Sequence, residues 1–294
     1  MSEQRIRDEV VLELSHVTKR FGGLTAVGDV SFKIRKGEIY ALIGPNGAGK
    51  TTIFNLITGV YALTEGEVKF MGETVGRGEL TYSVINDKPE AAKVVHNKPY
   101  NIMSRGMART FQNIRLFKSE TVYNNVLTAC HADANYNIFQ SLWRWKIGPK
   151  WLTKYYHQEK ALNAKTEELL KIMGIWQYKD MIAANLPYGQ QRKLEIARAL
   201  AANPTLLLLD EPAAGMNPEE TLALMELIRE VRDRFDLTVL IIEHHMDLVM
   251  NVSDRIFVLN FGKPLAQGTP EEIQNNEEVV EAYLGREEDE DGDA

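Results

Sequence analysis

The chain has 294 residues, 44% of them hydrophobic, and a formal net charge of −7. This length fits one large α/β domain, or one domain with an inserted subdomain. The sequence contains no apolar run of the roughly 18 residues needed to cross a bilayer, and its first residues lack the apolar stretch of a signal peptide. The single cysteine, Cys130, excludes an internal disulfide and fits a reducing compartment.

Acidic residues are concentrated at the C-terminus. Residues 286–294 hold six acids and one arginine, a charge of −5, which leaves −2 for the rest of the chain. We expect this segment to be a disordered, solubilising tail. Because there is no basic surplus elsewhere, we expect no nucleic-acid partner.

The N-terminal part of the chain is expected to form strands. Residues 10–14 and 29–34 favour strands, and the second run alternates cleanly between apolar and polar side chains. Residues 19–23 between them predict a turn that carries an exposed aromatic side chain, Phe21. A further strand is expected at residues 66–70.

Residues 121–174 have mainly helical patterns. Thr121 can cap a helix that runs to about His131, and residues 154–173 have the spacing of one long amphipathic helix. This block is therefore expected to be a helical subdomain inserted into an α/β core.

Two stretches are less regular. Residues 72–98 are polar and have no sustained periodicity, which predicts a surface insertion of low local order. Residues 137–151 are interrupted by a glycine and a proline at 148 and 149. We interpret their three tryptophans as packing residues of the helical subdomain, with an exposed patch facing a partner as the alternative; they are Trp143, Trp145 and Trp151.

The α/β pattern resumes towards the C-terminus. Asn217 followed by Pro218 is a strong helix start, with the cap at the asparagine and proline at the first position. The continuously apolar residues 237–242 are typical of a buried parallel strand. The remaining expected elements are a helix at 190–202, strands at 205–210 and 255–259, a helix from 218 to about 235, and a last helical region that opens at Thr269.

Residues 44–51 read G-P-N-G-A-G-K-T and predict a phosphate-binding loop. The preceding residues 38–43 favour a strand, and residues 52–58 have helical spacing, which is the context that such a loop requires. Its backbone N–H groups and the helix N-terminus would face the phosphates, with the Lys50 charge near the β- and γ-phosphates and the Thr51 hydroxyl on Mg²⁺. The expected nucleotide contacts in this loop are Gly44, Pro45, Asn46, Gly47, Ala48, Gly49, Lys50, Thr51 and Thr52.

Two acids follow the apolar strand at 205–210. The strand end is expected to place Asp210 beside the phosphate loop, where it can hold Mg²⁺ through water. Glu211 would lie one step further out, where it could polarise an attacking water. A pair of acids can also simply end a strand, and the phosphate loop favours the functional interpretation.

The stretch Leu186-Pro187-Tyr188-Gly189-Gln190-Gln191 resembles the L-S-G-G-Q signature of ABC-transporter ATPases. Other motifs of this family match in the same order, and the resemblance covers about residues 10–285. Gln112 matches the Q-loop glutamine, His244 the switch histidine, residues 214–217 the D-loop, and Phe21 the aromatic that stacks on adenine. Alone, Gln112 would be an ordinary loop residue, His244 a structural histidine and Phe21 a core residue; His245 is expected to face solvent.

The resemblance implies a fold and a division of the chain. The fold would be an α/β P-loop NTPase core, with a mixed sheet and an antiparallel β subdomain, plus an inserted α-helical subdomain that carries the signature. We expect one ATPase domain over 1–285, with the core at about 10–112 and 203–270 and the helical subdomain at about 113–202.

Two motifs depart from the broad family pattern. Pro187 and Tyr188 replace serine and glycine in the signature, so the usual serine contact to the partner's γ-phosphate is lost; proline also has no N–H group. The N–H groups of Gly189 and Gln190 at the helix start are expected to serve instead. The D-loop ends in Asn217 instead of aspartate. Both variants resemble the Liv-type ATPases of branched-chain amino-acid importers, the subunit with the larger helical insertion.

The resemblance also implies a mechanism and partners. Two cassettes would pair head to tail around two ATP molecules, each signature (Leu186, Tyr188, Gly189, Gln190) facing the partner's ATP. Glu211 would polarise water, His244 would position it, and Lys50 with Mg²⁺ on Thr51, Gln112 and Asp210 would stabilise the transferred charge. Implied partners are a second ABC ATPase subunit, more readily an unlike one, two membrane permeases and, indirectly, an extracytoplasmic solute-binding protein, with the chain peripheral on the cytoplasmic face of the inner membrane.

Other functions remain open at this point. The chain could serve another ABC transporter, such as a urea or amide importer or a lipopolysaccharide-type exporter, although the Pro-Tyr signature disfavours the exporter. A soluble ABC-type nucleotide switch usually carries two cassettes or a long coiled coil, and this chain has neither. The signature helix and the lack of an N-K-x-D motif exclude a GTPase or small-molecule kinase.

Overall fold

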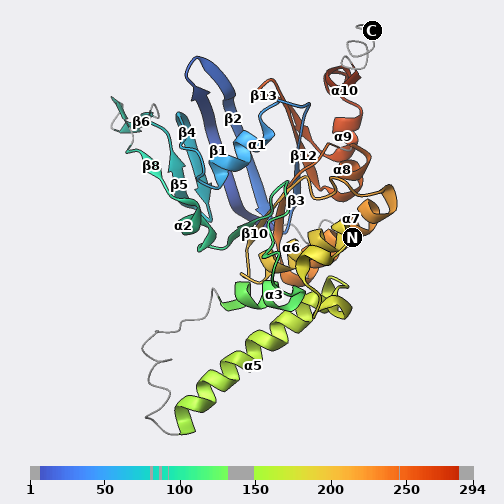
Figure 1. Cartoon of the computed structure of the whole chain (residues 1–294). Helices are drawn as coiled ribbons and strands as arrows, with labels where there is room; N and C mark the ends of the chain where they lie inside the picture. Colours follow the sequence, from blue (N-terminus) through green and yellow to red (C-terminus); the bar gives the residue numbers. More distant parts are fainter. Residues whose placement is uncertain are drawn as a thin grey trace. The chain divides into compact units, whose positions relative to one another are not determined.

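The structure is a computed structural model of the chain (Figure 1). It describes residues 7–79, 82–85, 88–91, 93–131, 149–244 and 246–284. The predictions for Trp143, Trp145, His245 and the acidic tail at 286–294 lie outside these residues, as does the side chain of Trp151.

The chain forms two compact units. The first contains residues 1–109, 205–214 and 221–294, and the second contains residues 110–204 and 215–220. Among the described residues, no helix is both long enough and apolar enough to cross a bilayer.

A six-stranded sheet runs through the first unit, in the order β13-β12-β3-β11-β10-β9. Its strands are parallel except for β13, which pairs antiparallel with β12. Every residue of β3, β10 and β11 is buried, as the apolar runs in the sequence predict for parallel strands covered on both faces. The strands are β3 (Ile39–Ile43), β9 (Met107–Arg109), β10 (Leu206–Asp210), β11 (Thr238–Ile242), β12 (Arg255–Asn260) and β13 (Lys263–Gly268).

The second sheet of this unit is antiparallel, in the order β2-β1-β4-β5-β8. The first strand extends through Phe21, so the expected turn at 19–23 is shorter than predicted and consists of Gly22 and Gly23. The sheet is formed by β1 (Arg7–Phe21), β2 (Leu24–Lys36), β4 (Glu65–Phe70), β5 (Glu73–Arg77) and β8 (Val95–His96); β6 (Tyr82–Ile85) and β7 (Lys88–Ala91) form a separate hairpin.

The expectation of low local order at 72–98 is wrong for β5 and β8. Strand β5 pairs with β4, buries Val75 to 2% exposure, and places Arg77 and Thr74 on the Glu67 carboxylate, with Thr74 Oγ1 at 2.6 Å. Five residues of strand contain too few alternations to be recognised from sequence. Cross-strand contacts with β4 hold this segment in the sheet.

The helices of the first unit flank these sheets (Figure 1). Apolar residues of both sheets and of α1, including Phe54, Leu208 and Leu240, form one buried cluster. This cluster fixes α1 directly after the loop at 44–49. The helices are α1 (Lys50–Ile57), α2 (Pro99–Met103), α8 (Met246–Val252), α9 (Pro270–Gln274) and α10 (Glu277–Leu284); α7 (Pro218–Phe235) begins in the second unit and continues in the first.

The second unit is helical, as the sequence predicts. Thr121 caps α3, where its hydroxyl accepts from the Asn124 N–H at 3.0 Å. The long helix α5 begins at Pro149, earlier than the expected residue 154, because proline fits the first helical turn and does not break it. The elements are α3 (Val122–Cys130), α5 (Pro149–Ile172), α6 (Tyr188–Leu200) and two 3₁₀ turns, η3 (Trp176–Tyr178) and η4 (Ala183–Asn185).

Candidate functional site

The loop at 44–49 wraps around the start of α1 and requires glycine at two positions. Gly44 has φ +152°, and a Cβ there would lie 2.1 Å from the Leu259 carbonyl oxygen. Gly49 has φ +101°, and its Cβ would lie 2.7 Å from the Ala26 carbonyl oxygen. Both positions therefore exclude a side chain on conformational and steric grounds.

Polar groups of this loop are available for an anion. The N–H groups of Gly47 and Gly49 have no hydrogen-bond partner among the described residues. The buried Lys50 ammonium donates to the carbonyl oxygens of Gly44, at 2.5 Å, and Pro45, at 2.9 Å. Free N–H groups at a helix N-terminus, with a lysine beside them, form a phosphate-binding site.

Thr51 and Asp210 are oxygen donors suited to Mg²⁺. The Thr51 side chain is exposed in the first turn of α1 and has no hydrogen-bond partner in the described part of the chain. Asp210 ends β10 with its side chain 5% exposed. A hydroxyl and a carboxylate are hard ligands of the kind that Mg²⁺ prefers. The third predicted ligand, Gln112, is exposed and belongs to the second unit.

Glu211 and His244 come together at the ends of two neighbouring strands. Asp210 ends β10 and Ile242 ends the parallel strand β11, so the residues that follow them leave the same edge of the sheet. The His244 ring Nε2 and the Glu211 carboxylate form a hydrogen bond. Glu211 has a left-handed backbone with φ +47°, and its N–H donates to the Ile242 carbonyl at 3.0 Å. Strained backbone conformations of this kind are typical of functional sites.

Glu243 is a further site residue that the sequence reasoning missed. Its side chain is buried, and Oε1 accepts the Ala213 N–H at 2.9 Å while Oε2 accepts the His244 N–H at 3.3 Å. It therefore orders the segments that follow both strands. The only sequence signal for this role is that an acid directly precedes the candidate histidine.

Phe21 lies in an exposed aromatic pair with Tyr61. The two rings meet edge to face at 5.3 Å, and Phe21 is 43% exposed. The Lys19 ammonium lies 4.9 Å from the centre of the Phe21 ring. The structure thus excludes a core role for Phe21 and leaves its ring partly exposed.

Tyr283 of α10 reaches the phosphate loop from the C-terminal part of the chain. Its phenol is buried against the Gly44 backbone, and this burial raises its pKa to about 12. Burial thus favours the neutral form of this phenol beside the loop.

The signature segment, residues 186–191, lies in the second unit at the start of α6. Tyr188 is 44% exposed, and its ring packs beside Gly215 of the D-loop segment, where a Cβ would lie 3.4 Å from Cε1. The prediction that the Gln190 N–H is available is wrong, because it donates to the Pro187 carbonyl at 3.0 Å. The Gly189 N–H has no hydrogen-bond partner in the described residues, and Leu186 is buried.

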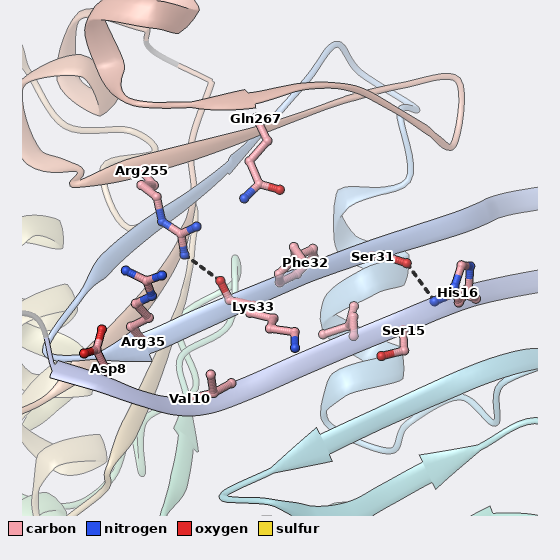
Figure 2. Close-up of a pocket in the computed structure, with 11 residues that line it drawn as sticks. Asp8, Val10, Ser15, His16, Ser31, Phe32, Lys33, Arg35, Arg255 and Gln267 are labelled. Carbon is pink, nitrogen blue, oxygen red and sulfur yellow. Dashed lines mark hydrogen bonds between the residues drawn. The ribbon is translucent and has the colours of Figure 1, made fainter.

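A hollow of about 480 Å³ in the first unit lies apart from these groups (Figure 2). Figure 2 shows Arg255 donating to the Lys33 carbonyl oxygen, at 2.6 Å, above the strands β1 and β2. Lys33 also pairs with Glu13 at 2.9 Å, and Arg255 with Glu38. None of the lining residues belongs to the phosphate loop, so this hollow is not the expected nucleotide site.

A glycine-rich loop before α1, an acid at the end of β10, and a carboxylate paired with a histidine are the arrangement expected of a P-loop ATPase of the ABC type. The family model described as ABC transporter matches residues 27–214, and the chain belongs to this family of transporter ATPases. Residues 263–289 match the model for branched-chain amino acid ATP-binding cassette transporters.

Similar proteins span nearly the whole chain. It is 42% identical to the high-affinity branched-chain amino acid transport ATP-binding protein BraF of Pseudomonas aeruginosa, over 94% of this chain and 98% of the relative. It is 43% identical to LivG of Salmonella typhimurium, over the same shares. Among solved structures, the ADP conformation of MJ1267, an ATP-binding cassette of an ABC transporter, has a TM-score of 0.74 and 29% identity, covering 94% of this chain and 99% of that one.

Proposed function

We propose that this ATPase is a subunit of a membrane importer for branched-chain amino acids. The pairing of Glu211 with His244 beside the phosphate loop is the observation that carries its hydrolytic role. The transported solute is supported by the names of the relatives and by the match at residues 263–289. The chain would lie peripherally on the cytoplasmic face of the inner membrane.

ATP would bind through the loop from Gly44 to Thr52. Lys50 would exchange the loop carbonyls for the β- and γ-phosphates, because a charged phosphate oxygen is a stronger acceptor than a carbonyl. The exposed ring of Phe21, held by Tyr61, would stack on the adenine. Thr51, Gln112 and Asp210 would hold Mg²⁺. When bound, the ion would neutralise part of the phosphate charge.

Hydrolysis would use the residues at the ends of β10 and β11. Glu211 would accept a proton from the attacking water as its general base. His244, which bonds the same carboxylate, would orient that water towards the γ-phosphate. Lys50 would stabilise the negative charge that develops on the phosphate oxygens.

Productive turnover would need a second cassette subunit. Leu186, Tyr188, Gly189 and Gln190 would form the surface offered to the partner's ATP, with Gly189 as the N–H donor and Gln190 in a packing role. The irregular signature favours an unlike partner over a second copy. Two permeases, and through them an extracytoplasmic solute-binding protein, would complete the importer.

Affinity capture from solubilised membranes tests this assembly. Recovery of two permeases and a second cassette subunit is expected, and a purely soluble set of partners would contradict the proposal.

Uptake of labelled leucine in a strain that lacks this chain tests the solute. Uptake should be restored by the parent chain and not by Glu211→Gln; unchanged uptake in the deletion strain would exclude the assigned solute.

Pro187→Ser is expected to change turnover in the assembled complex by roughly 10- to 100-fold, the scale of one hydrogen bond to a charged group. The new hydroxyl would face the partner's nucleotide, so the affinity of this chain for ATP should stay unchanged. Pro187→Ala is the matched control, because it restores the N–H group and adds no hydroxyl. Equal effects on turnover and on nucleotide affinity would argue against a role at the partner's site.

A further inference from the structure

Arg109 ends β9 and forms a buried ion pair with Asp210. The Arg109 Nη2 donates to Asp210 Oδ2 at 2.9 Å, and the two side chains are 6% and 5% exposed. A buried pair of this kind costs desolvation free energy and is not by itself a source of stability. Because one member of the pair, Asp210, is the candidate magnesium ligand, the pair calls for a functional explanation.

The other half of the same guanidinium binds α1. Nη1 donates to Asn55 Oδ1 at 2.8 Å and to Thr58 Oγ1 at 3.2 Å. The guanidinium group is planar and rigid, so donors on its two nitrogens hold their acceptors in a fixed relation. Arg109 thus ties Asp210 to the helix that carries Thr51 in its first turn.

This arrangement leaves one oxygen of Asp210 available. Oδ2 is bound to Arg109, and Oδ1 has no hydrogen-bond partner among the described residues. Oδ1 is also not one of the side-chain atoms that are fully buried without a partner. A carboxylate held at one oxygen cannot rotate freely, so Arg109 determines which oxygen Asp210 presents.

We propose that Arg109 is a positioning residue of the magnesium site, which orients Asp210 so that Oδ1 accepts from a metal-bound water. The inference rests on the proposed magnesium site and adds a residue to it. In this role Arg109 would act through Asp210 and would not itself bind the metal or the nucleotide. Residues that orient metal ligands change metal affinity by roughly 10- to 100-fold when they are removed.

The test compares metal binding with metal-free nucleotide binding in the Arg109→Met variant. Mn²⁺ is titrated against the ADP-loaded protein and followed by loss of the free-ion electron paramagnetic resonance signal. The Mn²⁺ dissociation constant should rise roughly tenfold, the lower end of the range for such residues. ADP affinity measured in EDTA should stay within about twofold of the parent value, because the phosphate loop itself is intact. An unchanged Mn²⁺ constant, or an equal loss of both affinities, would overturn the inference.

A double-mutant cycle with Asp210→Asn separates positioning from general packing. If Arg109 acts through Asp210, adding Arg109→Met to Asp210→Asn should change the Mn²⁺ constant by less than about twofold. A further tenfold loss in the double variant would place the effect of Arg109 elsewhere and reject the proposal.

Two further variants keep the outcome decisive. Arg109→Lys keeps the positive charge and loses the planar, two-sided set of donors of the guanidinium. Its Mn²⁺ dissociation constant should therefore lie between those of the parent and Arg109→Met. This variant decides the question if the methionine variant does not fold. Thr58→Val removes one contact between Arg109 and the end of α1. It should weaken Mn²⁺ binding by less than either Arg109 variant does. If the ADP-loaded parent protein binds no Mn²⁺, the magnesium site itself is wrong; if the parent and both Arg109 variants bind it equally, only the role of Arg109 is wrong.

Discussion

Glu211→Gln is expected to retain ATP binding and to lower ATP turnover by roughly 10²- to 10⁴-fold, the usual contribution of a general base. Glutamine has the shape of glutamate and can keep the contact with His244, so the site should remain assembled. Its amide cannot accept a proton from water at neutral pH. In the proposed pairing with a second cassette subunit, ATP should therefore remain uncleaved and hold the dimer closed, which size-exclusion chromatography of the two subunits with and without ATP would detect.

The matched control for this variant is Glu230→Gln. Glu230 is an exposed acid on α7 with no hydrogen bond or ion pair among the described residues, so its turnover should equal that of the parent. His244→Ala should also lower turnover, because the partner of the Glu211 carboxylate is lost. If Glu211→Gln turned over ATP at the parent rate, the assignment of Glu211 as the base would be wrong.

Arg192→Met is expected to destabilise the helical unit by about 3–5 kcal/mol, the cost of leaving one member of a buried ion pair without its partner. Arg192 has no solvent exposure and pairs with the buried Glu195 at 2.7 Å. It also donates to the carbonyl oxygens of Phe111, at 2.7 Å, and Gln112, at 2.9 Å. The variant would therefore loosen the segment that carries Gln112 as well as lower stability.

Urea unfolding followed by tryptophan fluorescence measures this effect selectively. All four tryptophans lie between positions 143 and 176 of the sequence, and Trp176 of η3 belongs to the helical unit. Lys193→Met is the control, because this neighbouring side chain of α6 has no hydrogen bond or ion pair in the described structure, and its free energy of unfolding should change by less than about 0.5 kcal/mol. A loss below about 1 kcal/mol in Arg192→Met would contradict the structural role of the pair.

Local patterns explain the expectations that the structure confirms. The apolar runs at 205–210 and 237–242 predicted buried parallel strands, because strands covered on both faces have no polar side to show. The caps of α3 and α7 were also recognisable; Asn217 Oδ1 accepts the Glu220 N–H at 2.9 Å. In each case the residues that decide the structure are close together in the sequence.

The errors have two origins, a partner strand that the local pattern does not reveal and backbone detail that residue types alone do not determine. The segment 72–98 had no clear periodicity, and β5 forms because β4 supplies its hydrogen-bond partners. Gln190 was expected to offer its N–H to a partner, but the turn that opens α6 directs this group to the Pro187 carbonyl. The reach of α5 back to Pro149 depends on the same kind of local backbone detail, which residue types alone do not determine.

The sequence by itself determined the family and predicted the phosphate loop and the site residues Asp210, Glu211 and His244, because each belongs to a short motif whose spacing the chemistry requires. Only the tertiary structure decided their partners. Arg109 meets Asp210 across 101 positions, and His244 meets Glu211 across 33. These contacts form because parallel strands bring their carboxyl ends to one edge of the sheet, and no local pattern encodes which side chains meet there.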